Sequence, residues 1–237
     1  MPRRTRPVVR LSLLALVLCA LGYYYAFTPR LSTAKQHLSS LSPNLAFSSN
    51  PKKLVPLEAH IISKCPDTRD ALRQLILPAM QRVSDKVDFR LNYIGTPTEN
   101  DGVDCKHGPS ECLGNIIELC ARELYPNPKT NLGFIMCLTK DYQHIPDRGL
   151  IEDCALEHAI DFDALNECAT RDDGAHGLEM LRHSIERTAK ANVTISCTIR
   201  LNDQVYCIRD GHEWKDCPKG PEVDSLVAAI DELASLL

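Results

Sequence analysis

The chain has 237 residues, of which 44% are hydrophobic and 24% are charged, and its formal net charge at pH 7 is −4. A chain of this length buries one full hydrophobic core, so we expect one folded domain. The mild negative charge and the aromatic content of 5% argue against a surface that follows nucleic-acid phosphates or stacks bases, so nucleic acid is not an expected partner.

The N-terminus has the pattern of a secretory-pathway signal. Residues 1–10 form a basic flank with four arginines that is expected to stay cytosolic, and residues 11–27 form an uncharged apolar run near the lower length limit for a membrane span. Two alternatives remain open: a retained type II anchor in the membrane, or a signal peptide cleaved near Ala20 and Gly22. Both place the rest of the chain in a lumen or outside the cell.

The next segments predict a stalk followed by a βαβ unit. Residues 28–55 are rich in Ser, Pro and Lys and suit a linker, so the folded domain is expected to span residues 56–237. In this domain the hydrophobic pattern predicts a buried strand at 56–63, a helix at 64–86 and a second strand at 87–95.

The remaining part predicts a helical insertion and then a hairpin and a closing helix. The insertion, about 104–190, carries six cysteines, and helical spacing marks four segments, at 115–125, 147–160, 161–171 and 177–192. Two strands, 193–203 and 204–211, are joined by the turn-forming pair Asn202-Asp203, and an amphipathic helix follows at 222–237. This order is what an α/β thioredoxin-like fold with a cysteine-rich helical insertion produces.

The expected compartment decides how the cysteines are interpreted. Of the eleven, Cys19 lies in the leader, and most of the other ten are expected to form disulfides in an oxidising lumen. A zinc cage at Cys105, Cys112 and Cys120 is not expected, because these residues are seven and eight positions apart whereas zinc sites pair ligands more closely.

Cys65 is the candidate nucleophile. It stands where the first predicted strand ends and the first helix begins, followed by Pro66, which an early helical position tolerates. A thiol there faces unpaired backbone N–H groups and the positive end of the helix dipole, both of which favour the reactive thiolate. The alternative is that Cys65 is a disulfide partner or a buried thiol.

The stretch "CKHGPSECLGNIIELC", residues 105–120, resembles the signature of the gamma-interferon-inducible lysosomal thiol reductase (GILT) family. Further matches are "ELYPN" at 123–127 and the positions of Cys137, Cys154 and Cys168, so that the resemblance covers about residues 56–237, with Lys106 where the family usually has glutamine. It implies a thioredoxin-like fold, residence in the secretory, endolysosomal or vacuolar lumen, and reduction of protein disulfides without a cofactor or metal.

The resemblance also implies residue roles. The signature cysteines would be structural, and the full set of structural disulfide candidates is Cys105, Cys112, Cys120, Cys137, Cys154, Cys168, Cys207 and Cys217. His107 and Glu111 could support the site from a distance, but turn formation and helix capping are the simpler interpretation. Asn192-Val193-Thr194 is a glycosylation sequon that suits a lumenal protein.

The chain departs from the family at the redox centre. The family pattern is Cys-x-x-Cys, whereas this chain reads Cys65-Pro66-Asp67-Thr68, so the resolving thiol is missing. The cis-proline that usually faces the dithiol is not visible, and Ser196 or Cys197 stands near that place. Thr68 could hydrogen-bond the Cys65 thiolate but not resolve a mixed disulfide; glutathione, a client thiol or Cys197 could do so.

Two functions follow. The first is a lumenal oxidoreductase that exchanges thiols with disulfide-containing client proteins through Cys65 alone. The second is a non-catalytic, disulfide-stapled relative that binds or retains clients. A bridge from Cys197 to Cys207 or Cys217 across the hairpin is an alternative to a free Cys197.

Overall fold

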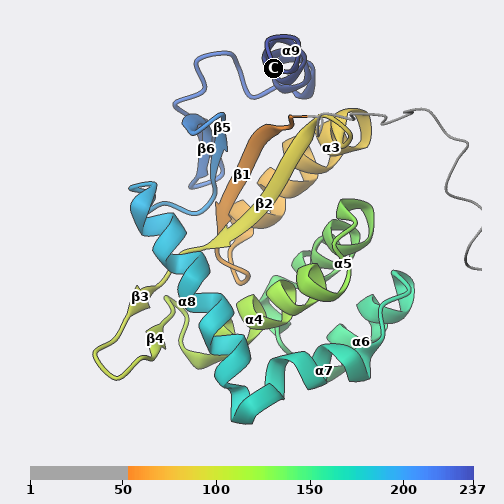
Figure 1. The fold of residues 1–237 in the computed structure, drawn as a ribbon, viewed down its shortest axis with the longest axis vertical. Coiled ribbons are helices and arrows are strands. Elements are labelled where there is room, and N and C mark those ends of the chain that lie inside the picture. Colours follow the sequence, from red (N-terminus) through yellow and green to blue (C-terminus); the bar gives the residue numbers. More distant parts are fainter. Residues whose placement is uncertain (1–52) are drawn as a thin grey trace, which may run out of the picture. The chain divides into compact units, whose positions relative to one another are not determined.

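A five-stranded sheet forms the centre of the protein, which is described here by a computed structural model for residues 53–237 (Figure 1). The leader and all but the end of the expected stalk lie outside these residues. The strand order is β2-β1-β5-β6-β7. The strands are β1 (Val55–Ile61), β2 (Val87–Tyr93), β5 (Thr198–Leu201), β6 (Gln204–Asp210) and β7 (Glu213–Lys215). β1 and β2 are parallel, whereas β5, β6 and β7 continue the sheet with antiparallel pairs.

The helix between β1 and β2 is the expected one, with a local irregularity. It runs as α2 (Pro66–Ala71), a π-helical turn (Leu72–Ile76) and α3 (Leu77–Val83). Pro78 stands in the first turn of α3 and has no N–H to donate to the preceding turn, which accounts for a wider turn just before it. Leu72, Leu75 and Ile76 of this helix are fully buried.

The predicted insertion contains one helix more than the sequence pattern indicated. Its helices are α4 (Pro109–Leu124), α5 (Pro128–Lys140), α6 (Arg148–Glu157), α7 (Phe162–Thr170) and α8 (Ala175–Lys190), with short 3-10 turns at Tyr142–His144 and Arg171–Gly174. α5 was missed. Its start carries two ordinary signals, because the Asn127 side chain accepts from Lys129 N and Pro128 opens the helix.

Other differences are confined to short strands. The expected strand at 193–203 is shorter, and regular pairing begins only at Thr198. The hairpin turn at Asn202-Asp203 is present, with both residues at positive φ. β7 and a two-stranded ribbon, β3 (Thr96–Pro97) with β4 (Val103–Asp104), were not predicted, because elements of two or three residues carry almost no periodic signal.

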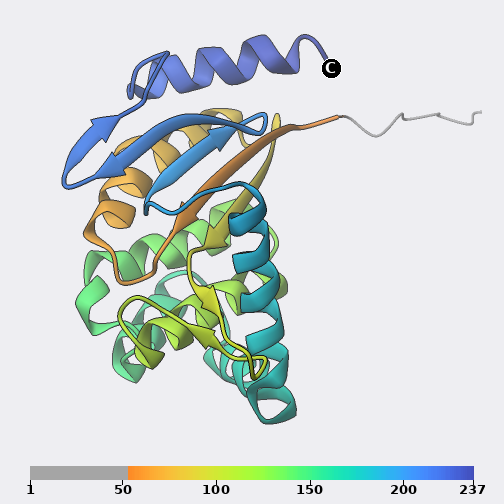
Figure 2. The ribbon, with the colours of Figure 1, turned by 90° about the vertical axis from the view of Figure 1, so that its left-hand side faces the viewer.

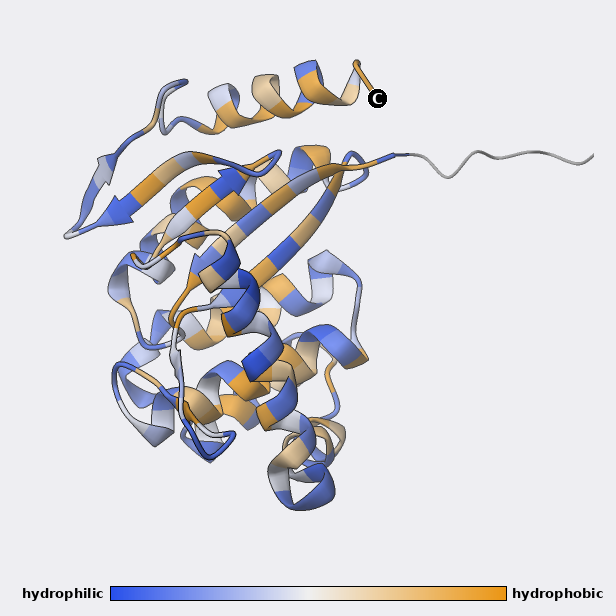
Figure 3. Cartoon of the chain, turned by 60° about the vertical axis from the view of Figure 1, so that its left-hand side comes forward, coloured by the Kyte–Doolittle hydropathy of each residue, from blue (hydrophilic) through white to orange (hydrophobic). Residues whose placement is uncertain are grey.

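The sheet lies between α9 (Val223–Ala234) and the helical block α4–α7 (Figure 2). α3 and α9 pack against each other, whereas α8 packs along β2 and the β3–β4 ribbon. The hydrophobic colouring follows the strands and the inner sides of the helices (Figure 3), and α9 buries Leu226 and Ile230 there. In residues 53–237, no helix is both long and apolar enough to cross a membrane.

A buried carboxyl lies in the core beneath β2. Tyr93, at the end of β2, donates from its hydroxyl to Glu118 Oε2 of α4 at 2.8 Å, and both side chains are buried. Burial raises the pKa of Glu118 to about 8, although the Tyr93 hydrogen bond opposes the shift. Glu118 is therefore protonated in the folded protein at neutral and acidic pH.

This shift predicts a pH dependence of stability. Between about 4.5, the ordinary pKa of the group, and about 8, the folded state holds one proton more than the unfolded state, so the free energy of unfolding falls as pH rises. Glu118→Gln keeps an acceptor for Tyr93 and cannot titrate. Urea unfolding at pH 5 and pH 8 should show that the wild type loses on the order of a few kcal/mol more than this variant. The exposed Glu186→Gln serves as control, and an equal loss in all three proteins would contradict the assignment.

Candidate functional site

Cys65 lies at the N-terminus of α2, on the loop that leaves β1. It is the residue before the first helical turn; its N–H donates to Ile62 O at 3.2 Å and its carbonyl accepts from Arg69 N at 3.2 Å. Among the described cysteines, only Cys65 and Cys197 are outside disulfides, and the Cys65 side chain is half-buried. The thiol is therefore both unbonded and reachable.

A cleft of about 430 Å³ opens beside Cys65. Its other lining residues are Ile62, Asp67, Ile94, Gly95, Thr96, Asp104, Cys105, Lys106, His107, Thr194, Ile195, Ser196 and Asp210. The walls thus mix charged side chains with apolar ones, of which Ile195 is 40% exposed. Exposed apolar surface beside a thiol suits contact with an extended client segment.

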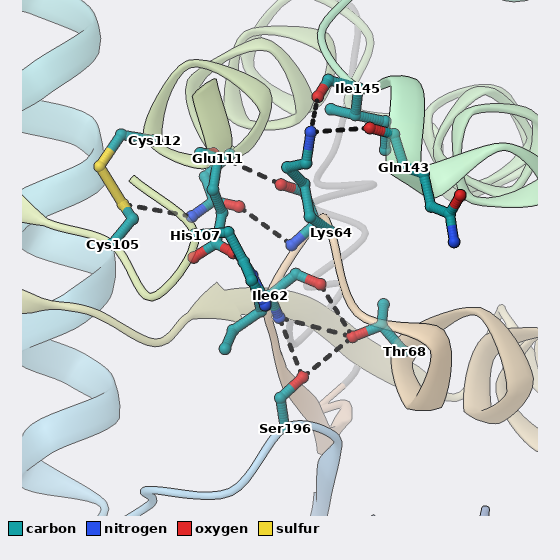
Figure 4. A network of polar contacts seen from close by, with 12 residues as sticks. Ile62, Lys64, Thr68, Cys105, His107, Glu111, Cys112, Gln143, Ile145 and Ser196 are labelled. Atoms are coloured by element: carbon teal, nitrogen blue, oxygen red, sulfur yellow. Dashed lines mark hydrogen bonds and ion pairs between the residues drawn. A yellow bond between two sulfur atoms is a disulfide. The ribbon is translucent and has the colours of Figure 1, made fainter. Parts of the chain in front are cut away.

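Thr68 occupies the place of the second cysteine, but its hydroxyl is used inside the fold (Figure 4). Thr68 Oγ1 donates to Ile62 O at 3.0 Å, lies 3.0 Å from Ser196 Oγ and is 3.4 Å from Ile62 N, which also donates to Ser196 Oγ at 3.1 Å. A hydroxyl has one proton to donate, and here the Ile62 carbonyl accepts it. The structure shows no bond from Thr68 to Cys65.

Cys197 is adjacent to this network but is a poor nucleophile. It is fully buried, and burial, together with the nearby Cys65 and Asp67, raises the pKa of its thiol well above the usual range. The peptide bond between Ser196 and Cys197 is cis, near the position at which thioredoxin-like folds usually have a cis-proline. A bridge from Cys197 to Cys207 or Cys217 is ruled out, because these two are joined to each other.

The eight other described cysteines form four disulfides. They are Cys105–Cys112, Cys120–Cys168, Cys137–Cys154 and Cys207–Cys217. Cys120–Cys168 joins α4 to α7 and Cys137–Cys154 joins α5 to α6, so that two bridges hold the helical block together and are buried within it. Cys105–Cys112 instead closes the loop before α4 and is half-buried.

Helix α4 packs closely against the Cys65 loop. Asn115 accepts from Ser63 N at 3.1 Å through Oδ1, and the Ser63 hydroxyl donates to Glu111 O at 3.4 Å. A Cβ on Gly114 would lie 2.9 Å from Ser63 Oγ and 2.5 Å from Ile145 Cγ2, so only glycine permits this approach. The Gly-Asn pair of the signature therefore positions the loop that carries Cys65.

His107 and Glu111 form a pair at the start of α4. The His107 ring is in direct contact with the Glu111 carboxylate, four positions along the chain, and the Glu111 side chain is buried. His107 also lines the cleft. The pair connects the cleft wall to the first turn of α4.

Asp67 connects α2 to the turn between β6 and β7 through two hydrogen bonds. Its carboxylate accepts from Gly211 N at 3.0 Å and from His212 N at 2.9 Å, in the turn between β6 and β7. Sequence reasoning missed Asp67 and Asn115 as parts of the site, whereas it placed Ser196 or Cys197 near the position that faces Cys65. For Asn115 the signature was the available signal, whereas Asp67 has none, because its partners are more than one hundred residues away in the sequence.

Two other polar features complete the survey. Glu123, Cys168 and His176 lie close together, as do Cys137, Glu157 and His158, but the cysteine of each group is in a disulfide and offers no thiolate ligand. Asn192 is exposed on the turn after α8, and its glycosylation stays a prediction.

The fold is shared with solved thiol–disulfide exchange proteins. A variant of alpha-DsbA1 from Wolbachia pipientis matches with a TM-score of 0.51 and 14% identity, over 79% of this chain and 88% of the other. The thiol-disulfide exchange protein alpha-DsbA2 from the same organism matches with a TM-score of 0.50 and 14% identity, over 78% and 84%. The chain therefore has a thioredoxin-like fold of the DsbA type, with a disulfide-rich helical insertion.

The sequence comparisons identify the family. The family model "Gamma interferon inducible lysosomal thiol reductase (GILT)" matches residues 56–158, which include Cys65 and the whole signature. GILT-like protein 1 of Drosophila melanogaster is 29% identical over 63% of this chain and 66% of its own length, and a GILT-like protein of Caenorhabditis elegans is 26% identical over 61% and 45%. Residues 56–158 thus match the GILT family, as the signature indicated, and the chain spans less than two thirds of these relatives.

The two free thiols of residues 53–237 should differ in reactivity. In the native protein, iodoacetamide at neutral pH should label Cys65, because it is half-buried in an open cleft, and should leave Cys197 unlabelled until the chain is unfolded. Peptide mass mapping distinguishes the two sites. Cys65→Ser should abolish native labelling, and native labelling at Cys197 would contradict the geometry.

Proposed function

We propose that this chain is a thiol oxidoreductase that exchanges disulfides with protein clients through Cys65. The observation that carries the proposal is an unbonded, half-buried cysteine at a helix N-terminus, in a cleft with charged and apolar walls, in a thioredoxin-like fold. Membership in a family named for a thiol reductase supports the same activity.

The first chemical step needs Cys65 alone. Its thiolate attacks one sulfur of a client disulfide, the bond from Cys65 Sγ to that sulfur forms, the client S–S bond breaks, and the departing client thiolate takes a proton. Thr68 cannot complete the cycle as a second thiol would. A glutathione thiolate can then attack Cys65 Sγ and release the reduced client; a second glutathione regenerates Cys65 and leaves as oxidised glutathione.

The proposed location is one in which disulfides persist. We propose that residues 56–237 work in the lumen of the secretory or endolysosomal pathway, delivered by the basic flank and apolar run of residues 1–27. Four disulfides in one domain fit an oxidising compartment. A retained leader would add a membrane anchor.

Reduction of insulin disulfides tests the activity. With glutathione as reductant, at pH 5 and pH 7, the purified domain should reduce insulin faster than Cys65→Ser. Cys197→Ser is the matched control and should keep the wild-type rate, because Cys197 is buried. Equal rates for the wild type and Cys65→Ser would remove catalysis through Cys65 and leave client retention as the function of the cleft.

Restoring the second thiol is a complementary test. Thr68→Cys recreates the spacing of a redox dithiol on α2 and supplies an intramolecular thiol for the second step. We expect client-linked species on non-reducing gels to decrease in this variant and insulin reduction to rise about tenfold. Thr68→Ser, which keeps the hydroxyl, is the control; mixed disulfides that persist unchanged in Thr68→Cys would contradict the role given to Cys65.

A further inference from the structure

The cleft beside Cys65 contains a second redox-competent group. Cys105 lines it, whereas the cysteines of the other three disulfides do not. Cys105 and Cys112 are both half-buried, while the two bridges inside the helical block are buried. A disulfide exchanges only with a thiolate that reaches one of its sulfurs, so access separates Cys105–Cys112 from the two bridges of the helical block, and Cys207–Cys217, whose Cys217 is half-buried, does not line this cleft.

A chain of contacts connects this disulfide to the Cys65 loop. Asn115 accepts from Ser63 N at 3.1 Å and points its Nδ2 at Cys105 Sγ, 3.8 Å away. Ser63 is two residues before Cys65, and Asn115 is fully buried between the two. Figure 4 shows Cys105–Cys112 at one edge of α4, with Glu111 and His107 between this disulfide and the loop from Ile62 to Lys64. The Asn115 side chain thus contacts both the β1–α2 loop and Cys105.

The other candidates for a resolving partner are poorly placed. Thr68 has no thiol, and its proton is donated to the Ile62 carbonyl. Cys197 is buried. Of the sulfur groups in residues 53–237, Cys105–Cys112 is the one that shares the open cleft with Cys65.

We propose that Cys105–Cys112 is a redox-active disulfide that resolves mixed disulfides formed at Cys65, taking the part of the missing second active-site cysteine. This inference rests on the proposed function of Cys65. It gives the signature loop a chemical role in addition to closing the chain before α4.

The exchange balances in the reducing direction. A small-molecule thiol, glutathione, first reduces Cys105–Cys112 to two thiols and leaves as its disulfide. Cys65 captures the client as above; the Cys105 thiolate then attacks Cys65 Sγ, the Cys65–Cys105 bond forms, and the client leaves as a thiol. Cys112 finally attacks Cys105 Sγ, which restores Cys105–Cys112 and frees Cys65. The client gains two electrons, which the Cys105/Cys112 dithiol loses.

Asn115 is a positioning residue in this scheme. Its amide nitrogen is a hydrogen-bond donor directed at Cys105 Sγ, and a donor at a sulfur stabilises the thiolate that forms there when the bridge opens. Cys105 is the sulfur that attacks Cys65 Sγ, because Cys105 lines the cleft together with Cys65 and Cys112 does not.

Trapping the internal intermediate tests the proposal. In the full chain carrying Cys112→Ser, Cys105 has lost its partner, and mild oxidation should join it to Cys65, seen as a linked peptide pair by non-reducing mass mapping. Cys168→Ser is the matched control, since it frees the buried Cys120 and should give no link to Cys65. A Cys105 that stays free in the folded variant while Cys65 remains reactive would overturn the proposal.

The wild-type chain gives a measurement that needs no variant. In glutathione buffers of decreasing oxidised fraction, alkylation and mass mapping should show Cys105 and Cys112 opening while the buried bridges Cys120–Cys168 and Cys137–Cys154 stay closed; opening together with or after these buried bridges argues against a redox role.

Turnover separates this inference from the proposed function. Cys105→Ser/Cys112→Ser should reduce insulin about tenfold more slowly than wild type and accumulate client-linked Cys65, with native labelling of Cys65 unchanged. A wild-type rate in this double variant would contradict the redox role of Cys105–Cys112 without contradicting catalysis by Cys65. Equal rates for the wild type and Cys65→Ser would instead remove the proposed function.

Discussion

The site depends on the close packing of helix α4 against the loop that carries Cys65. The glycine at position 114 lets the two backbones approach, and Asn115 then accepts the Ser63 N–H that would otherwise be buried without a partner. An unpaired buried backbone group costs on the order of 1–3 kcal/mol, so this contact strongly favours one loop position. The position and exposure of the Cys65 thiol follow from it.

The same loop is held on its other sides by groups that do not take part in chemistry. Lys64 donates to the carbonyls of Gln143 and Ile145, at 2.8 and 2.6 Å, which fixes the loop to the segment before α6. On the opposite side, Thr68 and Ser196 bind the backbone of Ile62. Thr68 therefore contributes hydrogen bonds to the fold, whereas a cysteine at this position would contribute a thiol for exchange.

The two disulfides of the helical block and the disulfide at the start of α4 differ in burial. Those that join α4 to α7 and α5 to α6 lie inside the helical block, where they constrain the unfolded chain and are shielded from exchange. The bridge at the start of α4 opens onto the Cys65 cleft. Under the proposal made above, the single cysteine before α2 would be joined in its chemistry by this second sulfur pair from another part of the chain.

The sequence by itself determined the family, the fold class and most of the long elements. Periodic apolar positions located β1, β2, α4, α6, α7, α8 and α9 well enough to place the βαβ unit and the closing hairpin and helix, because burial on one face leaves a repeat that can be read locally. It also singled out Cys65 and the signature stretch. α5 was missed although Asn127 and Pro128 mark its start.

Only the tertiary structure decided what surrounds Cys65. That Thr68 bonds to Ser196, that Asp67 binds the β6–β7 turn, and that Cys105 shares a cleft with Cys65 are contacts between segments tens to more than one hundred residues apart. The side chains in such contacts leave no periodic pattern in the sequence, since each depends on the path of the whole chain between them. Local interactions shape the helix that follows Cys65, and long-range packing decides which side chains surround this thiol.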